Sequence, residues 1–258
     1  TSLVRANNPS AMTLEGTNSW VLVEPGHHAA IVIDPGPDDP QHLQALLAAA
    51  LDSKATDVGL IVLTHSHADH AESANVFAAM TGAPVRAFDP ALCVGAGPLA
   101  DGESIEVDGL RLDVVASPGH TADSLCIVLP ADRSLFTGDT LLGSGSTVVA
   151  HPDGRLADYL DSLRALRALV DDRHLVAVRP GHGPTRDDPA ALIDGYLAHR
   201  EQRLDQVRRV IADGADTIEA VLHGVYADVD QALLYAARWS LLAQLEYLRE
   251  QGEPAPTT

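Results

Sequence analysis

The sequence predicts an α/β fold, a four-layer αββα sandwich in which two mixed sheets pack face to face with helices outside. Strand-like apolar stretches alternate with Ala- and Leu-rich stretches of helical length over most of the chain. Hairpin signals occur in both halves, at Asp34-Pro35-Gly36 and at Asp108-Gly109. This alternation, with a hairpin-rich region in each half, is typical of two sheets covered by helices.

The first half of the chain contains four expected strands and two expected helices. The strands are expected over residues 13–23, 29–33, 58–63 and 84–88. The helices are expected over residues 39–51, which open with a proline, and from Ala71 to Met80. Asp34 therefore ends a buried strand, and the strand over residues 58–63 leads into a polar loop.

The second half contains a hairpin over residues 103–115, strands over 124–129, 134–139 and 175–179, and a helix from about Leu156 to Val170. After residue 186 the sequence becomes helical. Asp188 and Pro189 begin a helix that runs to about Ala212, and sequences resembling capping boxes begin at Asp216 and Asp228. We therefore divide the chain into a main domain of residues 1–186 and a C-terminal helical appendage of residues 187–258.

Length and composition fit one large domain with an appendage. The chain has 258 residues, 46% of them hydrophobic, and no apolar run approaches the ~20 residues of a membrane-spanning helix, so no membrane partner is expected. We expect Cys93 and Cys126 to be free thiols in a reducing cytoplasm. The formal net charge of −19 disfavours nucleic acid as a partner, and a homo-oligomer is compatible with the sequence.

The polar loop after residue 63 holds the densest group of metal-binding side chains. His65, His67, Asp69 and His70 lie within six residues. Neutral imidazole and carboxylate are preferred ligands of Zn²⁺ and related ions. In an extended loop His65 and His67 point the same way toward one ion, while Asp69 and His70 turn toward a second. A polar surface loop would not explain this density directly after a buried strand, so the loop predicts a metal site.

Three further strand ends carry a residue of the same chemical types. They are His120 after Pro118-Gly119, Asp139 after Gly138, and His182 after Pro180-Gly181. Each of them alone is compatible with ordinary turn chemistry. Four strand ends that all finish in metal-binding residue types indicate one shared site.

The order His-x-His-x-Asp-His, followed by His, Asp and His, resembles the metallo-β-lactamase-fold hydrolases over about residues 13–183. The resemblance implies a dinuclear centre, most often of two Zn²⁺, with Mn²⁺ or Fe as alternatives. It also implies the ligands: His65, His67 and His120 for the first ion, Asp69, His70 and His182 for the second, and Asp139 bridging them. Asp69 and His70 are the catalytic candidates. These motifs specify the fold and the centre, and they leave the substrate open.

The resemblance also implies supporting residues around the ions. Asp34 matches an Asp that fixes a ligand histidine through its other ring nitrogen, although an Asp before a proline is also an ordinary turn residue. Asn18 matches an Asn that lies near the metals. In the C-terminal appendage, Arg200 falls on an apolar helix row, where it is either a member of a structural ion pair or an anchor for a substrate anion. His199 has the same two interpretations.

Within the family, the opening Thr13–Trp20 and the stretch Leu197–Arg203 are similar to the β-lactamase-like protein 2 branch, which includes a mitochondrial single-strand endoribonuclease. This resemblance implies a winged-helix-like appendage and a single-stranded RNA substrate. The short interval between Asp139 and His182 excludes the nucleases that carry a large extra domain there. The acidic appendage, without a basic stripe interleaved with aromatics, opposes RNA binding.

The expected chemistry is hydrolysis by a hydroxide that bridges the two ions, which lower the pKa of water toward ~7. Single-stranded RNA is the first substrate hypothesis. A thioester or ester of a small acyl molecule is the alternative, as in glyoxalase II or carrier-protein thioesterases. A third hypothesis is a mononuclear-iron persulfide dioxygenase, which uses a nearly identical motif and leaves the second metal site unused.

Overall fold

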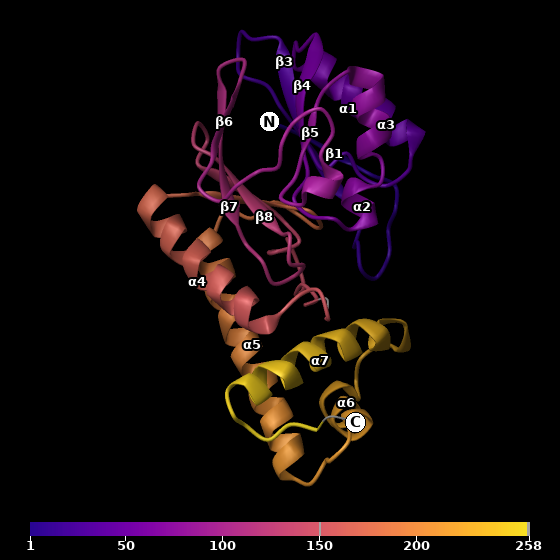
Figure 1. The fold of residues 1–258 in the computed structure, drawn as a ribbon, viewed down its shortest axis with the longest axis vertical. Helices are drawn as coiled ribbons and strands as arrows, with labels where there is room; N and C mark the ends of the chain where they lie inside the picture. The colour runs from indigo at the N-terminus through magenta and orange to yellow at the C-terminus, as the bar shows by residue number, and fades with distance from the viewer. Residues whose placement is uncertain (150, 257–258) are drawn as a thin grey trace.

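Two five-stranded sheets face each other in the computed structural model, which describes residues 1–149 and 151–256 (Figure 1). The first sheet has the order β1-β2-β3-β4-β5 and contains β1 (Ser2–Arg5), β2 (Asn18–Leu22), β3 (Ala29–Ile33), β4 (Asp57–Val62) and β5 (Val85–Arg86). The second has the order β10-β9-β8-β7-β6 and contains β6 (Ser104–Val107), β7 (Leu110–Ala116), β8 (Leu125–Leu129), β9 (Ser134–Gly138) and β10 (Ala177–Pro180). Each sheet contains both parallel and antiparallel pairs.

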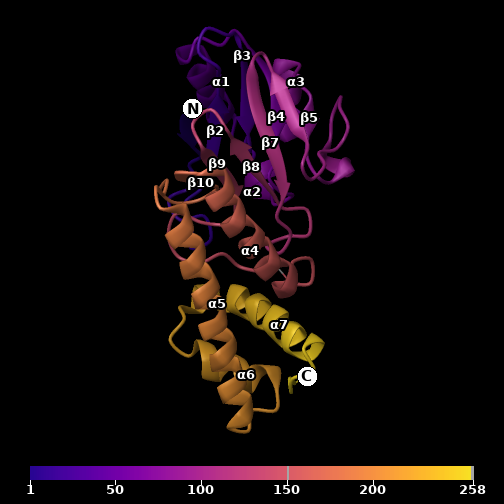
Figure 2. The same ribbon diagram turned by 90° about the vertical axis from the view of Figure 1, so that its left-hand side faces the viewer.

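The helices of the main domain lie outside the two sheets (Figures 1 and 2). They are α1 (Pro40–Asp52), α2 (Ala68–Ala71), α3 (Ala74–Thr81), the 3₁₀ helix Pro90–Leu92, and α4 (Leu156–Arg173). The appendage contains α5 (Pro189–Ala212), α6 (Ile218–Tyr226), the 3₁₀ helix Gln231–Leu233 and α7 (Leu234–Glu250). The expected helix over Pro189–Ala212 has the same bounds in the structure.

Three apolar clusters account for the layers. One cluster lies between the sheets and includes Trp20, Leu112 and Phe136. A second joins the other face of the first sheet to α1 and α3 through residues such as Leu46 and Phe77. The third joins the second sheet to α4 and continues into α5, α6 and α7. Because each sheet is apolar on both faces, each must be covered on both sides, and the predicted αββα sandwich is confirmed.

Two helix starts differ from the sequence prediction. In place of the single helix expected from Ala71 to Met80, α2 ends at Ala71 and α3 begins at Ala74. The chain is interrupted between them because the backbone N–H of Ser73 donates to the Gly36 carbonyl at 3.1 Å and the Ser73 hydroxyl donates to the Pro37 carbonyl. The capping-box sequence at Asp228 does not begin an α-helix. A 3₁₀ turn over Gln231–Leu233 follows it, and α7 begins at Leu234 without a side-chain cap.

The appendage extends the molecule away from α1 and α3 (Figure 2). Helix α5 packs along α4, and α7 returns to contact α4 as well. All regular structure in the described part of residues 187–256 is helical. The apolar cluster of the second sheet runs through this region without a break, so a domain boundary at residue 186 stays a prediction.

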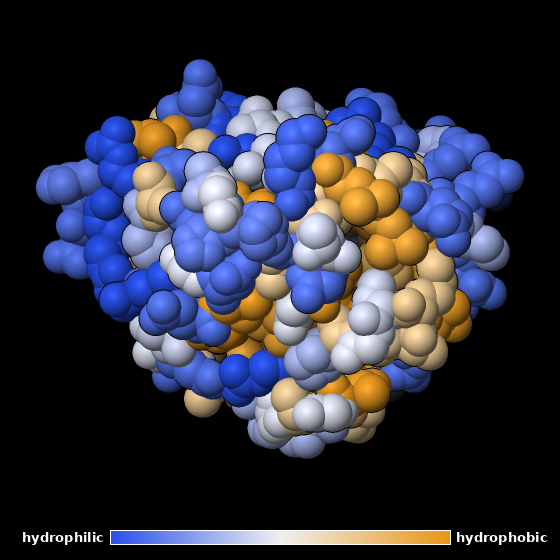
Figure 3. Space-filling view, turned by 90° about the horizontal axis from the view of Figure 1, so that it is seen from above, coloured by the Kyte–Doolittle hydropathy of each residue, from blue (hydrophilic) through white to orange (hydrophobic). Residues whose placement is uncertain are grey.

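Two surface properties bear on possible partners. No helix within the described residues combines the length and apolar character that crossing a bilayer requires. Figure 3 looks onto the end of the molecule that lies away from α6 and α7, and hydrophobic residues there are interspersed with hydrophilic ones. That end therefore offers no single continuous apolar face.

Candidate metal centre

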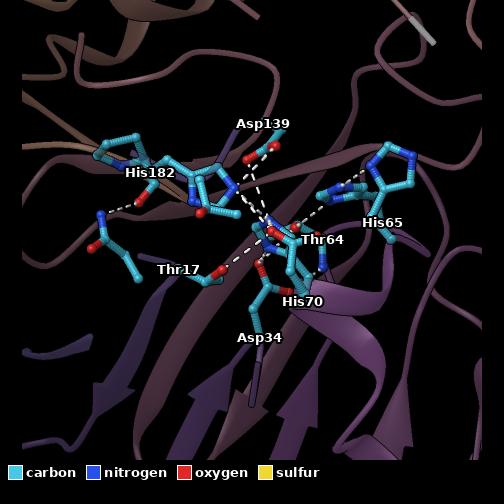
Figure 4. Close-up of polar contacts among 12 residues, drawn as sticks. Thr17, Asp34, Thr64, His65, His70, Asp139 and His182 are labelled. Carbon is cyan, nitrogen blue, oxygen red and sulfur yellow. Dashed lines mark hydrogen bonds and ion pairs between the residues drawn. The ribbon is translucent and has the colours of Figure 1, made fainter. Parts of the chain in front are cut away.

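A carboxylate that follows the neighbouring strand fixes the start of the loop between β4 and α2. Asp34 follows β3, which runs parallel to β4. Its Oδ1 accepts the backbone N–H of Thr64 at 2.7 Å, and its Oδ2 accepts the Thr64 hydroxyl at 2.7 Å (Figure 4). Asp34 has a φ of 52°, a left-handed conformation that is uncommon for a residue other than glycine. The side chains of His65 and His70 therefore leave a fixed backbone.

Three imidazoles form the first donor group. Nε2 of His65 lies 3.1 Å from Nδ1 of His67, and that atom lies 3.0 Å from Nε2 of His120. The other ring nitrogens have partners: Nδ1 of His65 lies 3.1 Å from the Thr64 hydroxyl, and Nδ1 of His120 donates to the Val148 carbonyl at 2.6 Å. Protons on those atoms leave the lone pairs of both Nε2 atoms directed at His67.

A second donor group combines a carboxylate with two imidazoles. Asp69 Oδ2 lies 3.1 Å from Nε2 of His182 and 3.4 Å from Nε2 of His70. His70 donates its Nδ1 proton to Asp34 at 2.9 Å, and His182 donates its Nδ1 proton to the Gly16 carbonyl at 3.3 Å. Both Nε2 atoms are therefore acceptors in the neutral rings.

Asp139 lies between the two groups. Its Oδ2 is 3.8 Å from Nε2 of His120 and 3.4 Å from Nε2 of His182, and its Oδ1 is 3.4 Å from Nε2 of His70. Oδ1 is buried and has no hydrogen-bond partner, because that last contact lacks hydrogen-bond geometry. The ligand atoms of each group lie within 4.8 Å of one another. The imidazole lone pairs of each group face each other, and Asp139 Oδ1 lies buried between the groups. A cation in each group would satisfy these atoms.

The pKa values of His65 and His120 in the first donor group are lowered, whereas that of His182 in the second is raised. Burial lowers the pKa of His120 to about 4 and, assisted by the neighbouring His70, holds that of His65 well below its usual range. Burial also opposes the charge of His182, but Asp139 and Asp69 outweigh it and raise its pKa to about 9. Burial opposes the charge of Asp69, but its hydrogen bond to His182 and the nearby His70 and His182 rings together outweigh burial and lower its pKa to about 2. Neutral imidazoles and ionised carboxylates are the forms that bind metals, so an ion in the second group would displace the proton that His182 holds at neutral pH.

Glycine at position 181 lets the second group close. A Cβ built there would lie 2.6 Å from Asp139 Oδ1 and 2.6 Å from Cε1 of His70. The loop that carries Gly181 is fixed by Asn18, whose side-chain amide donates to the carbonyls of Pro180 and Gly183 at 3.0 and 2.8 Å. The contacts of Asn18 thus position the loop that precedes and follows His182, and its expected place near the metals stays a prediction.

Two residues that sequence reasoning missed support Asp69. The hydroxyl of Thr17 donates to Asp69 Oδ2 at 3.2 Å, and Asn8 donates to that hydroxyl at 3.0 Å. The Asn8 side-chain oxygen also accepts the backbone N–H of Thr17 at 2.9 Å. The only sequence signal was that Thr17 precedes the noted Asn18, and nothing local marked Asn8.

A cleft of about 320 Å³ leads from this cluster to the appendage. His120 and Asp139 form part of one wall, and His199, Arg200 and Arg203 of α5 form part of another. The rest of the lining is largely apolar and includes Met12, Leu14, Leu142, Val148, Val229 and Leu233. Arg200 is 4% exposed, and its Nη2 donates to the Thr147 carbonyl at 2.6 Å. The pKa of His199 is lowered by burial and then by the two arginines.

Comparisons with known proteins find similar sequences and a similar fold. Residues 12–182 match the family described as the metallo-beta-lactamase superfamily. A beta-lactamase-like protein 2 homolog of Caenorhabditis elegans is 31% identical, over 96% of this chain and 84% of that protein. One from Drosophila melanogaster is 29% identical, over 95% and 86%. The crystal structure of a metallo-beta-lactamase family protein from Thermus thermophilus superposes with a TM-score of 0.80 and 24% identity, over 97% of this chain and 93% of that one.

Proposed function

The chain belongs to the metallo-β-lactamase superfamily, and from that premise we propose that it is a metal-dependent hydrolase that cleaves an ester or thioester of an acyl group with a largely apolar chain. Members of this superfamily are mostly metal-dependent hydrolases. The observation that carries the acyl assignment is the largely apolar cleft that begins at His120 and Asp139. Apolar clefts with a few convergent polar groups are typical of small-molecule sites.

The residues that would hold two ions are those of the two donor groups, with Zn²⁺ the first candidate and Mn²⁺ or Fe the alternatives. His65, His67 and His120 suit one ion, and Asp69, His70 and His182 suit the other, with Asp139 shared. When bound, such ions supply an acidified water as nucleophile and polarise the bond to be cleaved. The protein contributes fixed positions, because most of these rings have their second nitrogen tied to a named partner.

Asp69 is our candidate for accepting the proton of the attacking water. Its pKa of about 2 keeps it ionised at neutral pH. Its side chain is 27% exposed, so water and substrate can reach it, and the Thr17 hydroxyl holds one of its oxygens. His70 is fully buried, with Nδ1 on Asp34 and Nε2 facing the carboxylates. We therefore assign His70 a ligand role in place of the catalytic role that the sequence suggested.

Single-stranded RNA is the second candidate substrate. It is favoured by the exposed ring pair Tyr235 and Trp239 on α7, whose centroids lie 5.3 Å apart at 89°, since exposed aromatic rings can stack on bases. The formal charge of −19 opposes it, because RNA phosphates need a basic groove. The iron dioxygenase is less favoured, because the second donor group is complete.

The test compares a hexanoyl thioester with an end-labelled single-stranded RNA under the same conditions, using zinc-loaded protein. We expect thioester hydrolysis that stops on chelation and falls at least 100-fold in Asp69→Ala and His67→Ala, as for loss of a catalytic group. His28→Ala, an exposed histidine away from the cluster, is the matched control. RNA cleavage that disappears in the same two variants, without thioester hydrolysis, would replace the acyl assignment by the nuclease one.

A further inference from the structure

The cleft wall formed by α5 contains a buried cation without a counter-charge. The guanidinium of Arg200 donates to the Thr147 carbonyl and lies 5.0 Å from the centroid of the Tyr159 ring. Its Nε is buried and has no hydrogen-bond partner among the described residues. Among the described residues no carboxylate lies within 4.0 Å of its nitrogens.

Arg203, one helical turn further along α5, is partly buried and also lacks a counter-charge among the described residues. Its Nη1 donates to Gln206 at 2.7 Å and to the Val225 carbonyl at 3.3 Å, and its guanidinium lies 4.8 Å from the Tyr226 ring centroid. It too has no carboxylate within ion-pair distance in the described chain. His199 lines the cleft beside both arginines, and its buried Nδ1 has no hydrogen-bond partner in the part of the chain that the structure describes.

This absence of counter-charge contrasts with the rest of the protein. The chain has 36 Asp and Glu against 17 Lys and Arg, and most of its arginines form an ion pair with a carboxylate. A buried guanidinium without an anion has lost its hydration, and its remaining hydrogen bonds do not fully compensate for that loss, so its burial is unfavourable. In an acidic protein, a cleft lined by two unpaired arginines is therefore suited to receive an anion from outside.

We propose that Arg200, Arg203 and His199 form an anion subsite, so that the acyl substrate carries a carboxylate on the part that is not hydrolysed. This inference rests on the proposed acyl hydrolase function. The subsite and the metal-centre residues His120 and Asp139 line one cleft, so one molecule can reach both. The planar guanidinium matches a carboxylate, and the strongly negative net charge favours a monoanion over more highly charged groups.

The test uses two thioesters of N-acetylcysteamine, hexanoyl and adipoyl, which have the same chain length and differ by a terminal carboxylate. Wild-type protein should have the higher kcat/KM for the adipoyl ester. Arg203→Gln should lower the adipoyl-to-hexanoyl ratio of kcat/KM about tenfold, through the KM of the adipoyl ester, because a charge-assisted hydrogen bond is lost. Arg209→Gln is the matched control, since Arg209 lies on α5, is exposed and, among the described residues, bonds a backbone carbonyl alone.

Arg200 also holds the loop at Thr147, so its variants separate binding from loop support. Arg200→Gln should remove the adipoyl preference, and Arg200→Lys should restore part of it. A drop that is equal for both esters in Arg200→Gln, together with an unchanged preference in Arg203→Gln, would overturn the subsite while leaving the hydrolase proposal intact.

If neither ester is hydrolysed, the proposed function fails, and binding alone decides the subsite. Calorimetric titration with hexanoate then compares metal-loaded wild type with Arg203→Gln and Arg209→Gln. About tenfold weaker binding in Arg203→Gln alone supports the subsite. Equal binding in all three proteins assigns the carboxylate to the metal centre and refutes the subsite.

Discussion

His70 and Asp34 form a buried pair, in which the imidazole donates its Nδ1 proton to the carboxylate at 2.9 Å and the two side chains are 0% and 2% exposed. The same carboxylate holds the Thr64 backbone at the start of the histidine loop. One acid thus sets both the path of the loop and the tautomer of a ligand ring. When a metal is bound, the pair would make its affinity depend on a residue that does not belong to either donor group.

Replacing Asp34 should therefore weaken metal binding more than it weakens the fold. We expect Asp34→Asn to lower zinc affinity about 10- to 100-fold, as for other partners of ligand histidines. Competition with a chromophoric chelator measures this affinity, and thermal unfolding of the zinc-free protein measures the fold. Asp38→Ala, an exposed Asp in the same loop, is the control. Unchanged zinc affinity in Asp34→Asn would show that the pair is only structural.

The two donor groups predict two ions per chain. Elemental analysis of purified protein should give two zinc ions, and Asp139→Ala should lose one or both, because this carboxylate faces both groups. Asp161→Ala, an exposed acid on α4, should keep both ions. One iron per chain, with no second ion after metal supplementation, would favour the dioxygenase hypothesis over hydrolysis.

Gly181 provides a steric test of the same centre. Gly181→Ala places a methyl group 2.6 Å from Asp139 Oδ1 and from His70 Cε1, so one of these ligands must move. We expect loss of at least one ion with the sandwich still folded. Gly195→Ala is a matched control, because its Cβ meets nothing within 4 Å, and Ala in helix α5 should add about 0.5–1 kcal/mol to the free energy of unfolding. Full zinc content in Gly181→Ala would contradict the close approach.

The elements of the main domain could be predicted because their signals are local. Each expected apolar run of strand length contains a strand in the structure. The polar residue that follows it lies just beyond the C-terminal end of that strand, as His182 does after β10. Parallel strands that end at one edge bring such residues together. Strand β1 was missed, because Ser2–Arg5 is too short to show a clear period and is a strand only through its pairing with β2.

The contacts around the centre could not be predicted from local signals. Asn8 reaches Thr17, and through it Asp69, by a turn whose path no periodicity encodes. The cleft depends on how α5 and α7 pack against the loop at Thr147. The sequence put Arg200 on an apolar row and left two roles open. Only packing shows that its partner is a backbone carbonyl and that one face of the guanidinium covers Tyr159.

The two cysteines should differ in reactivity. Cys126 is fully buried in β8, and burial raises the pKa of its thiol from 9.0 to about 11. Because the thiolate is the reactive form, Cys126 should not react with a disulfide reagent at about pH 8, whereas the partly exposed Cys93 should react. Native protein should give one fast-reacting thiol equivalent and denatured protein two, and Cys93→Ser should remove the fast one. Two fast equivalents in native protein would show that β8 opens readily.

The raised pKa of Cys126 also means that the folded state keeps a proton which the unfolded state loses. The free energy of unfolding should accordingly fall as pH rises from 9 toward 11, and Cys126→Ala should reduce this fall.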